Sequence, residues 1–175
     1  MTRVILLEEL KRFTLEATKD IVMPVEPQEE DEGPPAPRPA QVFLMNLPDS
    51  ASYQREAPYI LHQIITGKDI HSPGQIYPSG MAVIRSVFCV YHENGQEGGL
   101  MLLNLMERMR IALMKQVIIG GQFTLDLREE LDALFYTEKT APFYGGEMIS
   151  QWKMKSIERE LNQWHEEVKI PFQNR

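Results

Sequence analysis

The segment Met81–His92 constrains the fold more than any other part of the chain, because both of its alternating faces are apolar. One face carries Met81, Val83, Val87, Cys89 and Tyr91, and the other carries Ala82, Ile84, Phe88 and Val90. Successive side chains of a strand point to opposite faces of a sheet, so a strand that is apolar on both faces has to be covered on both. The sequence therefore predicts that this segment is the central strand of a sheet.

Two segments show the periodicity of amphipathic helices. The first runs from about Thr2 to Val22, and Pro24 ends it. The second runs from about Gly98 to Val117 and ends before a pair of glycines. Its main apolar stripe consists of Leu102, Leu105, Met106, Met109, Leu113 and Val117. These are the two main helices that we expect to pack on the sheet.

Further strands are predicted where short apolar runs lie between turn-forming residues. The expected strands are Val42–Leu47, Tyr59–Thr66, Gln122–Leu127, Leu131–Tyr136 and Glu147–Lys155. Residues 128–130, which connect Gln122–Leu127 to Leu131–Tyr136, are compatible with an irregular connection and equally with one helical turn. The order α-β-β-β-α-β-β-β predicts a single α+β domain over residues 1–175, with a mostly antiparallel sheet flanked by the two helices.

Several turns follow from the same pattern of glycine, proline, asparagine and aspartate. Gly67–Asp69 is expected to close the second strand, and His71–Gly80 to form a loop. Glu93–Gly95 is expected to end the central strand, and Gly145-Gly146 to precede the last one. In the C-terminal tail, residues 156–175, the alignment of Leu161, Trp164 and Val168 predicts a short helix at about Glu158–Val168.

Residues 24–41 form an acidic, proline-rich segment with six of the twelve prolines and five acids against one arginine. Such a segment cannot bury apolar area and lacks backbone donors at its prolines. It is expected to be an exposed arm that projects from the domain, either as a solvated linker or as a segment that orders on a neighbouring subunit. In the second case its acids are candidate subunit contacts: Glu29, Glu30, Asp31 and Glu32.

The second helix carries more apolar surface than one sheet face can cover. Leu103 and Met114 widen its apolar arc, while Leu100 and Ile111 lie within its polar side. An excess of this kind suggests a contact with another subunit, although single exposed apolar residues are common. These four residues are therefore candidate interface residues.

The sequence contains no recognisable catalytic or metal-binding motif. The histidines do not occur at metal-ligand spacing, and Cys89 lies in an apolar run without a cysteine partner. A catalytic triad of Asp69, His71 and Ser72 is not expected, because triad members usually come from separate parts of a fold and not from one short loop. Turn and capping roles explain these three residues better. The four histidines are His62, His71, His92 and His165. We expect no catalytic residue, no metal and no cofactor.

Charge and hydropathy limit the partners. The net charge of −7 argues against a protein that grips nucleic acid through a broad basic surface, but not against one that lets DNA slide past. The apolar stretch Ile111–Gly121 is interrupted by Lys115 and Gln116, so no membrane span is expected, and the N-terminus lacks the pattern of a signal peptide. The expected location is the cytoplasm or a particle assembled there.

Two stretches resemble small proteins from the tail-assembly regions of phages and prophages of Gram-positive bacteria. They are residues 98–126 (GGLMLLNLMERMRIALMKQVIIGGQFTLD) and residues 140–160 (TAPFYGGEMISQWKMKSIERE), and residues 58–69 (PYILHQIITGKD) also fit. The shared features are a long apolar helix, its Gly-Gly-Gln-Phe exit and the Ala-Pro-Phe-Tyr-Gly-Gly-Glu-Met run. Among such proteins the chain is most similar to the tail terminator, or tail completion, family.

This resemblance implies a small α+β structural protein of the virion, with no enzymatic activity. It implies a homo-oligomeric ring, a hexamer, that caps the tail tube in the neck and joins the tail to the head-tail connector, next to a tail sheath where one is present. DNA would pass through its lumen without specific binding. The alternatives are another neck component, such as a head-closure or connector protein, or a baseplate part, and, from a different class, a small cytoplasmic enzyme or ligand-binding domain.

Overall fold

The computed structural model describes residues 2–28, 33, 35–48, 56–70, 79–137 and 141–155. The elements are α1 (Arg3–Thr18), β1 (Gln41–Leu44), β2 (Tyr59–Ile70), β3 (Ser79–Tyr91), α2 (Gly95–Gln116), β4 (Ile118–Ile119), β5 (Phe123–Leu125), β6 (Asp132–Phe135) and β7 (Phe143–Lys155). Strands dominate, and one sheet packs with two helices. The predicted α+β class is confirmed.

The sheet is built around the two longest strands, β3 and β7, which pair antiparallel along thirteen residues. The strand order is β1-β2-β3-β7-β5-β4, and β6 also pairs with β7, on the edge that it shares with β5. Among the described strands, β1 and β2 are the one pair that runs parallel. The mostly antiparallel sheet that the sequence predicts is therefore present, with β3 in its interior.

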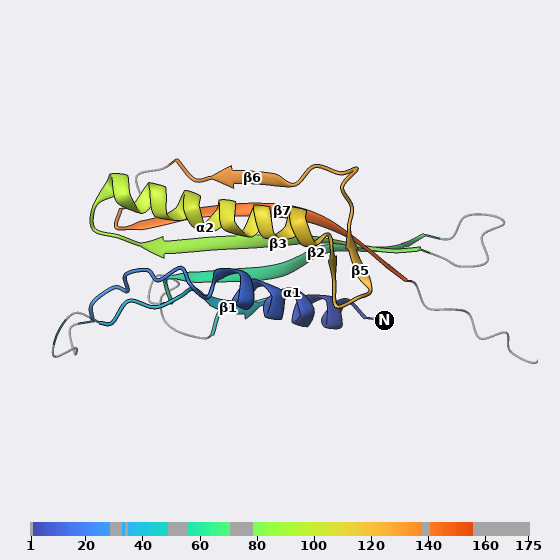
Figure 1. The fold of residues 1–175 in the computed structure, drawn as a ribbon, viewed down its shortest axis with the longest axis horizontal. Coiled ribbons are helices and arrows are strands. Elements are labelled where there is room, and N and C mark those ends of the chain that lie inside the picture. The colour runs from blue at the N-terminus through green and yellow to red at the C-terminus, as the bar shows by residue number, and fades with distance from the viewer. Residues whose placement is uncertain are drawn as a thin grey trace, which may run out of the picture.

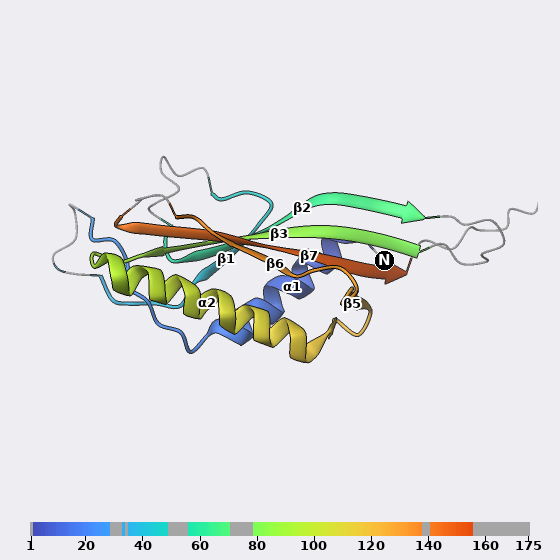
Figure 2. The same cartoon turned by 90° about the horizontal axis from the view of Figure 1, so that it is seen from above.

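Both helices cover the same face of the sheet, as the two cartoon views show (Figures 1 and 2). Burial alternates along β3 as far as Val90: the even-numbered residues from Gly80 to Val90 are buried, and the alternation ends at Tyr91, which is buried as well. Their partners on β7 are the even-numbered residues from Tyr144 to Met154, and all of these except Tyr144 are buried. The main core therefore lies between this face and the helices, and its largest side chains are Trp152, Phe88 and Phe123.

The second face of β3, which the sequence predicts to be covered, is covered only in part by the described residues. Val83, Val87 and Cys89 are only half-buried there, and among the described residues no helix packs over them. A smaller apolar cluster covers one end of this face, with Tyr59 and Phe143 among its members. An apolar pattern shows that a side chain can be buried, but it does not show what covers it.

The two helices begin and end at residues that cap them. Thr2 accepts a hydrogen bond from the backbone of Ile5 and starts α1, while Asn94 accepts from Gln96 and Glu97 and starts α2. Helix α2 therefore begins three residues before the position expected. Helix α1 stops at Thr18, and not at Val22, although the chain beyond it is still buried at Ile21 and Met23.

Two of the predicted turns lie inside strands. β2 continues through Gly67–Asp69 to Ile70, because β3 pairs with it up to Ser79. β7 begins at Phe143 and includes Gly145 and Gly146. A side chain at Gly145 would collide with the ring of Tyr136, so this glycine permits a close approach and does not break the strand.

The base of the acidic arm is folded. Met23 and Arg38 form an antiparallel bridge with two backbone hydrogen bonds of 2.9 Å, and the Arg38 guanidinium donates to the carbonyls of Glu56, Ala57 and Pro58. At the other boundary Ala40 is buried and Gln41 already belongs to β1. The exposed arm is thus shorter than residues 24–41. Its acids at positions 29–32 lie outside the described residues, as does the C-terminal tail, residues 156–175, with its predicted helix.

Two adjacent glycines of α2 give a matched test of this packing. Gly98 is buried, and a Cβ there would overlap the ring of Tyr144 on β7, whereas a Cβ on Gly99 would meet nothing within 4 Å. We expect Gly98→Ala to destabilise the fold by about 1–3 kcal/mol through overpacking. Gly99→Ala should stabilise it by roughly 0.5–1 kcal/mol, because alanine is the better helix former. Urea denaturation of both variants measures this difference, and equal effects would contradict the packing described here.

Candidate interaction surfaces

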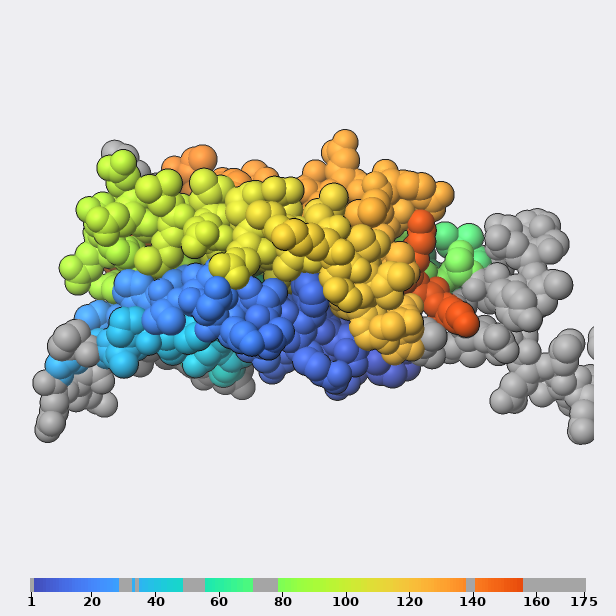
Figure 3. Space-filling model, in the orientation of Figure 1, coloured from blue at the N-terminus to red at the C-terminus, as the bar shows by residue number. Residues whose placement is uncertain are grey.

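Helix α2 is apolar on two opposite faces. The buried stripe that faces the sheet is the one predicted, and it includes Leu102, Leu105 and Met109. The four candidate interface residues lie on the opposite side and are exposed: Leu100 (60%), Leu103 (41%), Ile111 (41%) and Met114 (45%). Figure 3 shows α2 in yellow-green along the front of the molecule, directly above α1. We call these four residues the exposed stripe.

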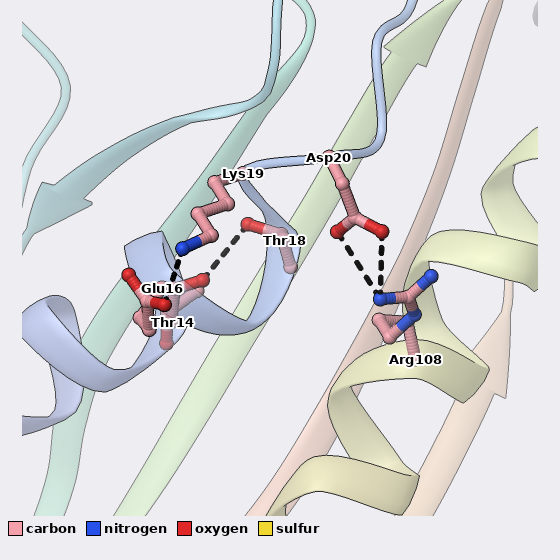
Figure 4. Close-up of polar contacts among 6 residues, drawn as sticks. All are labelled: Thr14, Glu16, Thr18, Lys19, Asp20 and Arg108. Carbon is pink, nitrogen blue, oxygen red and sulfur yellow. Dashed lines mark hydrogen bonds and ion pairs between the residues drawn. The ribbon is translucent and has the colours of Figure 1, made fainter.

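Charged groups lie within and beside the exposed stripe. Arg110 donates to both carboxylate oxygens of Glu107, with a closest distance of 2.7 Å, and this contact lowers the pKa of Glu107. On the neighbouring side of the helix, Arg108 Nη1 lies 3.1 Å from each carboxylate oxygen of Asp20, just after α1 (Figure 4). This ion pair connects α2 to the end of α1. Because both pairs are exposed, they add little stability, but they fix where charge lies around the stripe.

The C-terminal end of the exposed stripe borders a shallow hollow of about 220 Å³. Met114 lines it together with Leu127, Leu131 and Gln151. Asp126 lies at its floor and accepts from Lys153 at 2.7 Å and from Arg128 at 3.3 Å. These hydrogen bonds hold the pKa of Asp126 at about 2, so this buried carboxylate stays charged at any ordinary pH.

The open face of the sheet carries one polar cluster. Glu147 on β7 accepts from Arg85 on β3 and from the hydroxyl of Tyr136, which follows β6, at 2.9 Å. The contact with Tyr136 and the ion pair with Glu147 raise the pKa of Arg85. Sequence analysis missed this cluster, because its members are brought together only by the register of three strands.

The fully buried His62 has a structural environment. Thr14 Oγ1 donates to the carbonyl of Leu10 at 2.8 Å, so its lone pair is free to accept from His62 Nε2 at 2.9 Å. The other ring nitrogen, Nδ1, then accepts from the hydroxyl of Ser86 at 2.8 Å. Burial lowers the pKa of His62 to about 3. The ring is therefore neutral and links α1 to β2 and β3 through the core.

The remaining residues considered for chemistry are not brought together. Burial raises the pKa of Cys89 to about 11, which keeps it a thiol. Asp69 forms an ion pair with Arg3 at 3.0 Å, and His92 lies 3.2 Å from Glu97 in the turn before α2. His71, Ser72 and His165 lie outside the described residues. Within the described part of the chain, no three His, Cys, Asp or Glu side chains are grouped so that they could hold a metal ion.

Neither of the two described helices is both long and apolar enough to cross a membrane. No protein-family model and no curated protein matches the sequence. Thirty chains of solved structures match it, among them one described as the virion of a native gene transfer agent (GTA) particle. The match has 5% sequence identity and a TM-score of 0.36, and covers 66% of this chain and 78% of that chain. A TM-score of this size carries no information on function.

The buried histidine predicts how stability depends on pH. The pKa of His62 is lower in the folded chain than in an unfolded one, so the unfolded state binds a proton first as the pH falls. Between about pH 6.5 and 3 this group should remove up to about 1.4 kcal/mol of stability per pH unit. His62→Gln keeps a donor and an acceptor for Thr14 and Ser86 but does not titrate. We expect it to flatten the pH dependence between pH 6.5 and 4.5 in urea denaturation.

The matched control is His92→Gln, which removes a histidine at a turn but leaves the contacts of His62 with Thr14 and Ser86 in place, so it should flatten the slope less than His62→Gln does. If the His62→Gln protein kept the full wild-type slope, another group would be responsible.

Proposed function

We propose that this protein is a non-enzymatic structural subunit of a phage particle, and that it acts as a tail terminator. In this proposal, copies of the chain form a closed ring, a hexamer, that caps the tail tube in the neck. The ring presents a surface to the head-tail connector, and DNA passes through its lumen. The resemblance of residues 98–126 and 140–160 to tail-assembly proteins supports this assignment.

The observation that carries the proposal is the second apolar face of α2. A helix that packs on a sheet needs one apolar stripe, and the opposite side is normally polar. Here Leu100, Leu103, Ile111 and Met114 expose a second stripe along the same helix. A closed ring requires two different patches on each subunit, and an exposed apolar helix face is suited to be one of them.

A reconstruction of the particle tests the assignment directly. We expect a sixfold ring of this protein between the tail tube and the connector. Twelvefold symmetry at this level would favour a connector component instead. Threefold symmetry or a single copy would refute the hexameric terminator.

A substitution in the exposed stripe tests the contact. Leu103→Glu combined with Ile111→Glu places two carboxylates in the proposed interface, where burying unpaired charge is strongly unfavourable. We expect ring formation on tail tubes to weaken at least tenfold, which corresponds to about 1.4 kcal/mol or more. Occupancy of the ring in tail reconstructions measures the loss, and circular dichroism checks that the fold is kept.

The matched control is Leu15→Glu on α1, because Leu15 is also exposed (43%) but lies on the other helix. This variant should assemble normally. If the control and the stripe variant lost assembly equally, the effect would come from added charge and not from the proposed contact.

A further inference from the structure

The exposed stripe of α2 ends near the place where the described chain ends. Met114, the last residue of the stripe, and Gln151 on β7 line the same hollow. Only three residues separate Gln151 from Lys155, where β7 ends. In Figure 1 the C-terminal ends of α2 and β7 lie at the same end of the molecule. The C-terminal tail, residues 156–175, therefore leaves the fold next to one end of the exposed stripe.

The sequence of this tail is that of a segment that needs an apolar partner. Leu161, Trp164 and Val168 recur at helical spacing, and Asn162 and Gln163 fall on the opposite side. A helix as short as this is only marginally stable by itself in water. Packing its apolar stripe on another surface would stabilise it.

The charges of the two segments are complementary where the tail begins. The predicted tail helix, Glu158–Val168, holds four glutamates, at positions 158, 160, 166 and 167, against Arg159, and Lys155 and Lys169 flank it. From residue 104 to residue 115, α2 has three basic residues against the single acid Glu107. Arg110 is paired with Glu107 and Arg108 with Asp20, so Lys115 is the most available of the three. A chain that turns back after Lys155 runs antiparallel to α2, so its first acids come close to Lys115.

We propose that the C-terminal tail folds back as a short helix and covers the exposed stripe of α2 in its own chain. In this arrangement Leu161 and Trp164 pack against Met114 and Ile111, and the acids of the tail lie beside the basic residues of α2. The tail has about twenty residues, which is enough to turn and to cover the roughly 16 Å from Met114 to Leu103 at 1.5 Å per residue.

The docking of the tail is argued without the proposed function. Its consequence for ring assembly rests on that function. If the stripe is a ring contact, the tail and the neighbouring subunit compete for the same surface. The free subunit then keeps its apolar stripe covered, and assembly requires that the tail moves away. The tail would thereby limit ring formation in the absence of a tail tube.

Cysteine cross-linking in the full-length chain tests the docking. Leu161→Cys is combined with Met114→Cys in one variant and with Ile111→Cys in a second, so that a shift by one helical turn is also detected. After mild oxidation with diamide, we expect an intrachain disulfide in most of the monomeric protein of at least one variant. Non-reducing electrophoresis and mass spectrometry identify the product. Cys89 is half-buried, and burial raises its pKa to about 11, so it stays a thiol and reacts more slowly than the introduced cysteines.

The matched control replaces Leu161→Cys by Gln163→Cys, on the opposite side of the predicted helix, with the same two partners on α2. It should form at least tenfold less intrachain disulfide. The inference is overturned if neither variant forms the bond, if the control forms as much, or if the product is a covalent dimer, which would assign the tail to a second copy.

This outcome is independent of the proposed function, because the cross-link is measured on the free subunit. A sixfold ring in the particle together with no intrachain bond would keep the terminator assignment and overturn the docking. An intrachain bond in a protein that never forms a ring would support the docking and overturn the terminator assignment.

Discussion

The antiparallel pairing of β3 with β7 is the constraint on which the other elements depend. Its register runs without interruption from Ser79↔Lys155 to Tyr91↔Phe143. A shift by one residue would move every side chain of one strand to the other face of the sheet. Because the register holds, Phe88 and Trp152 face the same side, and both helices have to bury their apolar stripes there.

The periodicity of the sequence was sufficient to predict the elements whose own residues are buried. In α2, Leu102, Leu105 and Met109 follow helical spacing, and the structure buries each of them. The same analysis failed where a distant segment decides the conformation. Gly67–Asp69 has the composition of a turn, yet it continues β2 because the first residues of β3 lie opposite.

The candidate interface could be predicted only in part. Leu100 and Ile111 interrupt the polar side of a helical pattern, and that local anomaly was enough to mark them as exposed. The cluster of Arg85, Tyr136 and Glu147 gave no such signal, because its members lie on or beside three different strands. Which surface covers an exposed residue depends on contacts between separate parts of the chain, and no periodicity contains that information.

The bridge between Met23 and Arg38 closes the arm at its base. Two backbone hydrogen bonds and the Arg38 guanidinium hold both ends of the arm, so its length hardly affects the domain beneath. Each doubling of a flexible loop adds only about 0.6 kcal/mol of closure entropy. The interval between these two residues is therefore a natural insertion point, where the protein can carry an epitope or a fluorescent domain with little loss of stability.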